Sequence, residues 1–433
     1  MSDFVFTLLL CFLIIFSCLS FGSVTILPLT IVETIAGFAV LLWLLEMAYK
    51  RKLVFLKTGL FLPALLFLGL AIFQLIPLPI SFLRVVSFNT VYLYEKLIPD
   101  NIRPVFLPLS IHPDMTLAEL FKLFTYLGIF FLIINKVKKI SQIAFLINLI
   151  IFFGMFISIF GLIIKFRYPA SSSFGPFVYR NNFAGYINMI IPLSVGYFLI
   201  NMHFPRRLIY IFASAIMTLA LFLSLSRGGV LIYISVLLLI FLLSRLKETL
   251  KERAPVLIIW FLLILLLFIF FLKAGVVWNR LATLFKRESF VVLGHGYSWL
   301  DVLRIWRDFP IFGTGLGTFG SISAMYKSLS GQGLYVYAHN DYLQLLSEAG
   351  LAGFIIAAIF FGLYLFSTIK LWLKRREPYV VCLALGGICS ILGMLIYSLL
   401  DFNLHIPAVA LLFFIIMGLV YRIILLERKD EAR

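Results

Sequence analysis

Long apolar stretches recur through almost the whole chain, and they restrict its fold more than any other feature of the sequence. A transmembrane helix needs about 20 mostly apolar residues, and stretches of that length occur about twelve times here. Hydrophobic residues make up 63% of the 433 positions and charged residues only 13%, so a water-soluble globule is excluded. We expect an all-α polytopic membrane protein. The expected spans are residues 4–21, 24–47, 59–77, 117–135, 140–164, 183–202, 208–225, 229–243, 255–273, 350–373, 379–400 and 406–426.

Clusters of Lys and Arg support this count. They follow even-numbered spans, at residues 50–52, 136–139, 206–207, 245–253, 374–376 and 428–429. Such clusters mark the cytoplasmic side of a membrane protein. Both termini are therefore expected on the cytoplasmic side. The formal net charge of +17 follows from the same rule and needs no nucleic-acid partner.

The longest segment without an expected span is residues 274–349. It lies on the outer side, between spans 9 and 10, and is rich in aromatic and Gly residues, so we expect a folded, partly helical loop with a helix at 296–308. Residues 1–433 are expected to form one membrane domain that includes this loop. The four cysteines all lie in apolar stretches without a neighbouring His, and no Asp-x-Asp pair is present. Neither a disulfide framework nor a metal or other cofactor is expected.

The end of the outer loop carries one of five histidines, His339, followed by Asn340 and Asp341. Helical spacing of the following residues predicts a helix that starts near His339 and is capped by Asn340 or Asp341. His is the side chain that most easily exchanges a proton near neutral pH, so His339 is a candidate general base. The alternative is a histidine with a purely structural place at the mouth of a transmembrane helix.

Arg227 is the second candidate, because it lies between two apolar stretches with Gly228 and Gly229 behind it. A guanidinium at the membrane surface needs a partner, and a phosphate or carboxylate fits its geometry. The alternative is an Arg that extends to the interface.

Arg180, Asn181 and Asn182 precede the sixth span and form a candidate site for an anion or a sugar hydroxyl; simple helix capping is the alternative. Asp401 and His405, between the last two spans, either face the same site or only orient and cap these helices. The candidate cations and His339 all fall on the outer side. Cations with a general base suggest a lipid-linked phosphate or pyrophosphate and a hydroxyl nucleophile.

The ordered motifs resemble the O-antigen ligase and O-antigen polymerase (Wzy-type) superfamily over roughly residues 165–425. His339-Asn340, nine residues and Gly350-x-x-Gly353 fit the ligase loop pattern. The other matching segments are 180–186, Ser226-Arg227-Gly228-Gly229, 308–319 and 401–407.

The resemblance implies a GT-C-like helical fold in the bacterial inner membrane with a periplasmic active site. It implies metal-independent, inverting transfer of a glycan from undecaprenyl pyrophosphate to an acceptor hydroxyl in lipopolysaccharide biosynthesis. His339 would then be the general base, and Arg227 would bind the pyrophosphate. Asn340, Asp341 and the 180–182 segment would contact substrate.

The family also places a second Arg in the loop, four residues before a Trp. Here that Trp is Trp299, and His295 stands in place of the Arg. The resemblance leaves His295, Arg280 and Arg287 as candidates for the second phosphate contact, with Arg280 first.

The motifs do not separate a ligase with a lipid A-core acceptor from a polymerase that extends another lipid-linked glycan, or from transfer to a protein. The large loop with His339-Asn340 favours the ligase. A transporter of the same lipid is the alternative from another class. It would need ionisable groups along a path through the membrane, and the middles of the expected spans are almost free of them.

Overall fold

Long apolar helices dominate the computed structural model, which describes residues 3–51, 55–99, 104–169, 172–200, 204–253, 255, 257, 260, 295–327 and 336–426. In this part of the chain nine helices are long and apolar enough to cross a membrane, and α1 and α3 are shorter apolar helices. This confirms the polytopic helical fold. The expected span 255–273 lies almost entirely outside the described residues, so the count of twelve stays a prediction.

The apolar helices are α1 (Asp3–Leu19), α2 (Ile26–Tyr49), α3 (Phe61–Leu75), α6 (Pro113–Lys136), α7 (Ile140–Arg167), α8 (Arg180–Leu199), α9 (Phe204–Leu223), α10 (Arg227–Ser244), α17 (Asp341–Lys374), α18 (Pro378–Tyr397) and α19 (Pro407–Leu425). The shorter elements are η1 (Phe21–Ser23), β1 (Leu78–Pro79), α4 (Ile80–Val86), α5 (Phe88–Leu97), β2 (Phe106–Leu107), α11 (Glu248–Lys251), α15 (His295–Asp308), α16 (Phe319–Tyr326) and η2 (Asn403–His405). The two strands are antiparallel, with Leu78 opposite Leu107 and Pro79 opposite Phe106.

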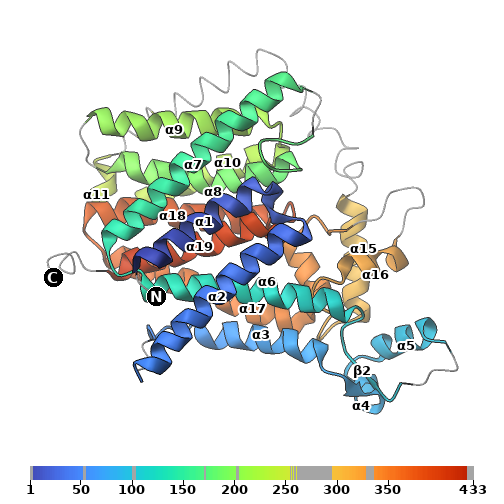
Figure 1. The fold of residues 1–433 in the computed structure, drawn as a ribbon. Helices are drawn as coiled ribbons and strands as arrows, with labels where there is room; N and C mark the ends of the chain where they lie inside the picture. The colour runs from blue at the N-terminus through green and yellow to red at the C-terminus, as the bar shows by residue number, and fades with distance from the viewer. Residues whose placement is uncertain are drawn as a thin grey trace.

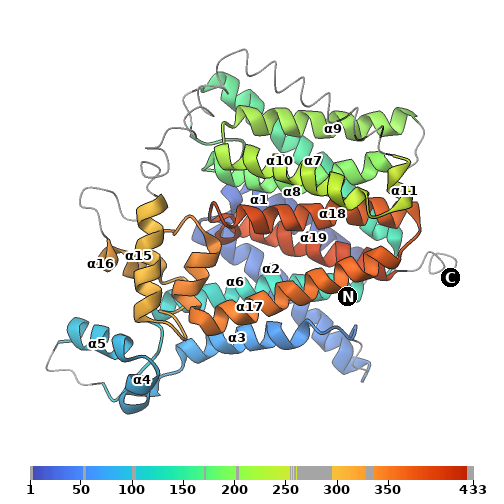
Figure 2. The ribbon, with the colours of Figure 1, turned by 180° about the vertical axis from the view of Figure 1, so that it is seen from behind.

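The long helices lie side by side, and α8, α18 and α19 form the centre of the bundle (Figures 1 and 2). The most apolar window is 100% buried in α8 and 89% buried in α19. Glycine allows α18 to approach α8, because a Cβ at Gly386 would lie 2.3 Å from the Pro192 carbonyl oxygen. Close backbone approach at small residues is typical of helices that pack within a membrane.

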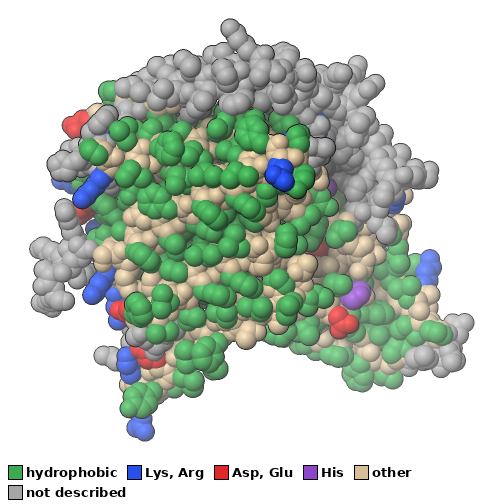
Figure 3. Space-filling model, turned by 45° about the horizontal axis from the view of Figure 1, so that its top comes forward, with side chains coloured by type: hydrophobic (Ala, Val, Ile, Leu, Met, Phe, Trp, Pro, Cys, Tyr) green, Lys and Arg blue, Asp and Glu red, His purple; other side chains and the backbone are tan. Residues whose placement is uncertain are grey.

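Large apolar side chains point away from this centre and cover the outside of the bundle. Figure 3 shows a broad hydrophobic face, with most of the visible Lys and Arg side chains at its left edge. The exposed fractions of Leu65 in α3, Ile163 in α7 and Phe366 in α17 are 61%, 60% and 64%. Such a surface requires lipid rather than water around it.

Helices α2, α6, α10, α17 and α19 end, and α1 begins, at one end of the bundle (Figure 1). The basic clusters at residues 136–139, 245–253 and 374–376 begin at or directly after the ends of three of these helices. Arg375, after α17, donates hydrogen bonds to the carbonyl oxygens of Ile424 (2.6 Å) and Leu426 (2.8 Å) at the end of α19. Lys247 donates to the Leu373 carbonyl oxygen at 2.6 Å. These cations satisfy carbonyl groups that have no partner within their own helix.

The opposite end of the bundle carries α15, α16 and the start of α17 (Figures 1 and 2). The expected helix at 296–308 is confirmed as α15. α17 is interrupted at Gly350, whose φ of 62° and ψ of −168° are not helical. The interruption lets the 310–315 turn pack against it: Leu351 N donates to Pro310 O at 2.8 Å, and Gly315 N to Glu348 O at 2.9 Å. Gln74 of α3 closes the same turn by donating to Phe312 O and Glu348 O.

Gly350→Ala should destabilise the protein by about 2–4 kcal/mol. The positive φ of Gly350 is one that a residue with a Cβ rarely adopts, and the added Cβ would displace close neighbours. The added Cβ would lie 2.3 Å from the Ile311 carbonyl group. Thermal unfolding of the purified protein in detergent measures the effect.

Gly362→Ala is the matched control on the same helix, since a Cβ there meets nothing within 4 Å. It should leave the unfolding temperature unchanged or raise it, as Ala favours helix more than Gly does. Equal unfolding temperatures for the two variants would contradict the account of the break in α17.

Candidate active site

His339 lies at the end of the bundle that carries α15 and α16, in the last residues before α17. Its backbone is left-handed, with a φ of 51°, so the chain turns there. Asn340 then caps α17, because its Oδ1 accepts hydrogen bonds from Tyr342 N and Leu343 N, each at 3.0 Å. The predicted capped helix start is thus confirmed. The His339 side chain is 31% exposed, so one side of the imidazole stays accessible.

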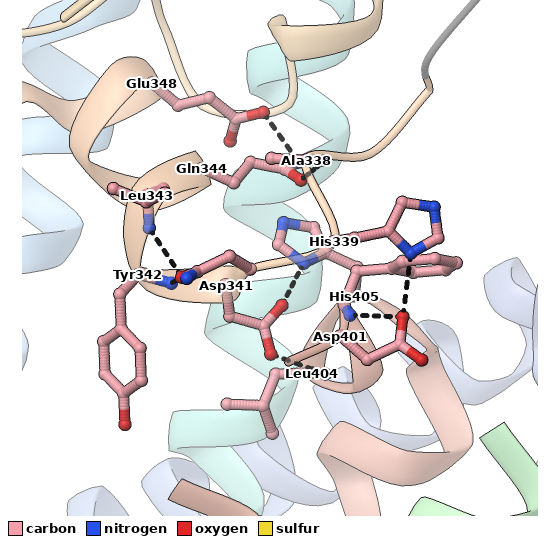
Figure 4. A network of polar contacts seen from close by, with 12 residues as sticks. Ala338, His339, Asp341, Tyr342, Leu343, Gln344, Glu348, Asp401, Leu404 and His405 are labelled. Atoms are coloured by element: carbon pink, nitrogen blue, oxygen red, sulfur yellow. Dashed lines mark hydrogen bonds and ion pairs between the residues drawn. The ribbon is translucent and has the colours of Figure 1, made fainter. Parts of the chain in front are cut away.

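A buried carboxylate orients this imidazole. Oδ1 of Asp401 lies 3.1 Å from Nδ1 of His339 and also accepts a hydrogen bond from Phe402 N at 3.0 Å (Figure 4). Asp401 is only 3% exposed. The edge of the His339 ring meets the Phe402 ring, with 4.8 Å between centroids. Carboxylate and aromatic ring together hold the His339 imidazole in one orientation.

Asn181 links this carboxylate to the start of α10. Its Nδ2 donates to Asp401 Oδ2 at 2.8 Å, and its Oδ1 accepts from Ser226 Oγ at 2.9 Å. Ser226 is the N-cap of α10 and accepts a hydrogen bond from Gly229 N at 3.2 Å. Arg227 is the first residue of α10 and is partly buried. A continuous chain of hydrogen bonds therefore runs from His339 to the residue beside Arg227.

A second His–Asp pair crosses the first. Nδ1 of His405 lies 2.7 Å from Oδ1 of Asp341, and Oδ2 of Asp341 accepts from Leu404 N at 3.3 Å (Figure 4). His339 and Asp341 belong to one segment, and Asp401 and His405 belong to the other. Each segment therefore supplies one His and one Asp, and the two pairs fix the segments to each other.

Burial acts to lower the pKa of His405, but the hydrogen bond to Asp341 and the charges of Asp341, Glu348 and Glu119 outweigh it and raise that pKa above its usual value. A carboxylate beside an imidazole favours the protonated ring. Asp341 therefore favours the charged form of His405 in the folded protein.

Glu348 fixes the glycine-rich turn beside the site. Its Oε2 accepts from Gly317 N at 2.9 Å, and its Oε1 accepts from Phe319 N at 3.1 Å and from Gln344 Nε2 at 3.0 Å. This carboxylate therefore aligns α16 and its preceding turn with α17.

The structure brings some of the expected site residues together and leaves others apart. Arg180 begins α8, next to Asn181. Asn182 is buried, and within the described residues its Oδ1 has no hydrogen-bond partner. Arg280 lies outside the described residues. His295 begins α15, and its side chain is outside the described part. In the described residues no group of three or more His, Cys, Asp or Glu side chains could hold a metal ion.

From the sequence, Asp401 and His405 could either face the candidate site or only orient and cap helices. In the structure, Asp401 contacts His339 and His405 contacts Asp341. The available signal was weak: an acidic residue and a His four positions apart, between two apolar stretches. Ser226 had no signal of its own apart from the motif around Arg227.

A multi-pass helical membrane protein with a carboxylate-oriented His and an Arg at one end of its bundle fits a class of membrane enzymes that transfer groups to hydroxyls. The O-Antigen ligase family model matches residues 212–358, which include Arg227 and His339. This match confirms the resemblance to the O-antigen ligase and Wzy-type family and supports a glycosyl-transferring membrane enzyme that acts on lipid-linked or polysaccharide glycans. No curated protein matches the chain significantly.

His405→Gln should flatten the dependence of thermal stability on pH. The pKa of His405 is raised in the folded protein, so its stabilising effect is complete below the unfolded pKa of about 6.5 and is lost as the pH rises through the folded value. Unfolding temperatures measured from pH 6 to 9 should therefore fall less in the variant than in the wild type. An equal fall in both proteins would contradict the ion pair.

Proposed function

We propose that this protein is a metal-independent, inverting glycosyltransferase that moves a glycan from undecaprenyl pyrophosphate to an acceptor hydroxyl. The reaction takes place at the periplasmic face of the bacterial inner membrane, with both termini in the cytoplasm. The acceptor is a lipid A-core or another glycan. The single observation that carries the proposal is the hydrogen-bonded chain from His339 through Asp401, Asn181 and Ser226 to the start of α10, where Arg227 lies.

His339 acts as the general base. Carboxylate oxygens accept hydrogen bonds, so Asp401 favours the His339 tautomer in which Nδ1 carries the proton. Nε2 then has a free lone pair and takes the proton from the acceptor hydroxyl. As in other His–carboxylate pairs, the carboxylate also stabilises the imidazolium that forms.

The oxygen of the acceptor attacks the anomeric carbon as its proton moves to Nε2. The bond between that carbon and the pyrophosphate oxygen breaks, and its electron pair leaves with the pyrophosphate. Attack from the face opposite the leaving group inverts the anomeric carbon. The polyprenyl pyrophosphate is released, and the proton on His339 returns to solvent or to the leaving group.

Arg227 binds the pyrophosphate and stabilises the charge that develops on it. A guanidinium pairs with phosphate through two hydrogen bonds, and the amide groups at a helix start favour an anion. Arg180 begins α8 and adds a cation next to Asn181. Arg280, with His295 as the other candidate, supplies the second phosphate contact from the outer loop.

Asn181, Asn182, Asn340 and Asp341 contact the substrate, and Asn340 also fixes the start of α17. Asn340 does so by capping α17, since its Oδ1 accepts two amide hydrogen bonds and its Nδ2 donates to Leu399 O at 3.0 Å. The substrate therefore meets a helix start that is already fixed before binding.

His339→Ala should lower kcat by about 10²–10⁴-fold, because a general base contributes about that factor. Arg227→Ala should lower it by about 10²–10³-fold, as expected for loss of a group that stabilises transition-state charge. Purified protein is mixed with undecaprenyl-pyrophosphate glycan, an acceptor and EDTA, and products are separated on a gel. Lipid A-core and lipid-linked glycan acceptors are tested in parallel, so the product also separates a ligase from a polymerase.

Arg307→Ala is the matched control, because Arg307 is an exposed cation of the same outer loop. It should transfer glycan at the wild-type rate, with EDTA harmless. If wild type transfers to neither acceptor while the lipid-linked glycan crosses a liposome bilayer and His339→Ala has no effect, the protein is a transporter and the proposal is wrong.

A further inference from the structure

A cavity lies beside the Asp341–His405 pair. Its volume is about 210 Å³, and its walls come from α3, α6, α17, α19 and the link before α19. Asp341 and His405 line it, so one of the two crossed His–Asp pairs forms part of its wall. The cavity therefore borders the segment that carries His339.

The charged and His side chains of the lining lie at one end of this cavity. Glu119 and Lys122 lie in the first turns of α6, Asp341 and Glu348 in the first turns of α17, and His405 directly before α19. Of these helix ends, the start of α17 directly follows His339, and His405 belongs to the same link as Asp401.

Apolar side chains line the deeper part. Phe360 and Phe361 lie several turns further along α17, Phe414 lies within α19, and Phe67 lies within α3. A polar mouth above an apolar interior matches the orientation of an amphiphile in the outer half of a membrane, with its head at the mouth and its chain inside.

The charges at the mouth do not suit a phosphate. Glu119 forms an ion pair with Lys122, and Asp341 pairs with His405. Glu348 adds a third carboxylate, so no cation at the mouth lacks a carboxylate beside it. Carboxylates repel an anionic head and accept hydrogen bonds from hydroxyls. Arg227 and Arg180 begin α10 and α8, which connect to Asp401 through Asn181, whereas this mouth is built on Asp341.

We propose that this cavity holds the acceptor, and that the acceptor is a single-chain amphiphile with an uncharged, hydroxyl-bearing head such as a neutral sugar. The inference rests on the proposed transfer reaction and narrows its acceptor: of the acceptors considered above, a lipid A-core, whose lipid has several chains, is excluded, and a glycan on a single chain remains. Pockets for drug-sized ligands measure about 300–1,000 Å³, so this smaller cavity takes one chain segment rather than a multi-chain lipid. The head lies at the Asp341–His405 pair, and its hydroxyl reaches His339 from there.

A binding experiment tests this without any transfer. The protein is reconstituted in lipid nanodiscs and irradiated with dodecyl maltoside that carries a diazirine in its chain. Mass spectrometry should place the label on Phe360, Phe361 or Phe414. Unlabelled dodecyl maltoside should compete at least about tenfold better than dodecyl phosphate, which has the same chain and an anionic head. Equal competition, or labelling spread over the outside of the bundle, would overturn the proposal.

Ala357→Trp fills the cavity from α17 and should reduce labelling at least tenfold. Ile359→Trp is the matched control, because Ile359 lies on the same helix and is exposed on the outside of the bundle. Ala64→Phe fills the same cavity from α3 and replaces Ala357→Trp if that variant does not fold. Unchanged labelling in a folded, filled variant would contradict the site.

The transfer reaction gives a separate readout. With a neutral single-chain acceptor, Ala357→Trp should raise KM for the acceptor and leave KM for the donor unchanged. If wild type binds the maltoside but transfers nothing, the proposed function is wrong and the binding site stands. If wild type transfers and Ala357→Trp leaves the acceptor KM unchanged, the proposed acceptor site alone is wrong.

Discussion

The carboxylate of Asp401 joins three segments that are far apart in the sequence. Its oxygens contact His339 before α17, Asn181 at the start of α8 and the backbone of its own link before α19. It is nearly fully buried, and a buried carboxylate is stable only when several groups hydrogen-bond to it. Loss of any one partner therefore affects the others, and the geometry of His339 depends on helices that do not touch it directly.

The hydrocarbon of the membrane explains why this polar network lies at one end of the helix bundle rather than in its middle. Backbone and side-chain polar groups within lipid must be satisfied inside the protein, which favours uninterrupted helices. The break at Gly350, the glycine-rich turn and the left-handed His339 all lie at the end of the bundle that carries α15 and α16, in contact with other protein segments. Basic residues fill the corresponding role at the other end, where they satisfy the carbonyl groups of helix ends.

The helices and their caps could be predicted from the sequence, because both depend on neighbouring residues. Apolar stretches predicted the spans, and the His339-Asn340-Asp341 sequence predicted a capped helix start, which the structure confirms at Asn340. The contacts of Asp401 could not be predicted, since its partners lie 62 and 220 positions away. The same limit applies to Glu348, whose carboxylate fixes the 313–319 turn. The roles of Arg280 and His295 remain predictions, because the side chains concerned lie outside the described residues.

The central claim is that Asp401 acts on the reaction through His339. A double-mutant cycle of His339→Ala and Asp401→Asn, scored by the initial rate of glycan transfer, tests it most directly. If Asp401 only orients and polarises His339, Asp401→Asn slows the wild type and has no further effect once His339 is alanine. If the two losses multiply in the double variant, Asp401 acts independently of His339 and the account is contradicted.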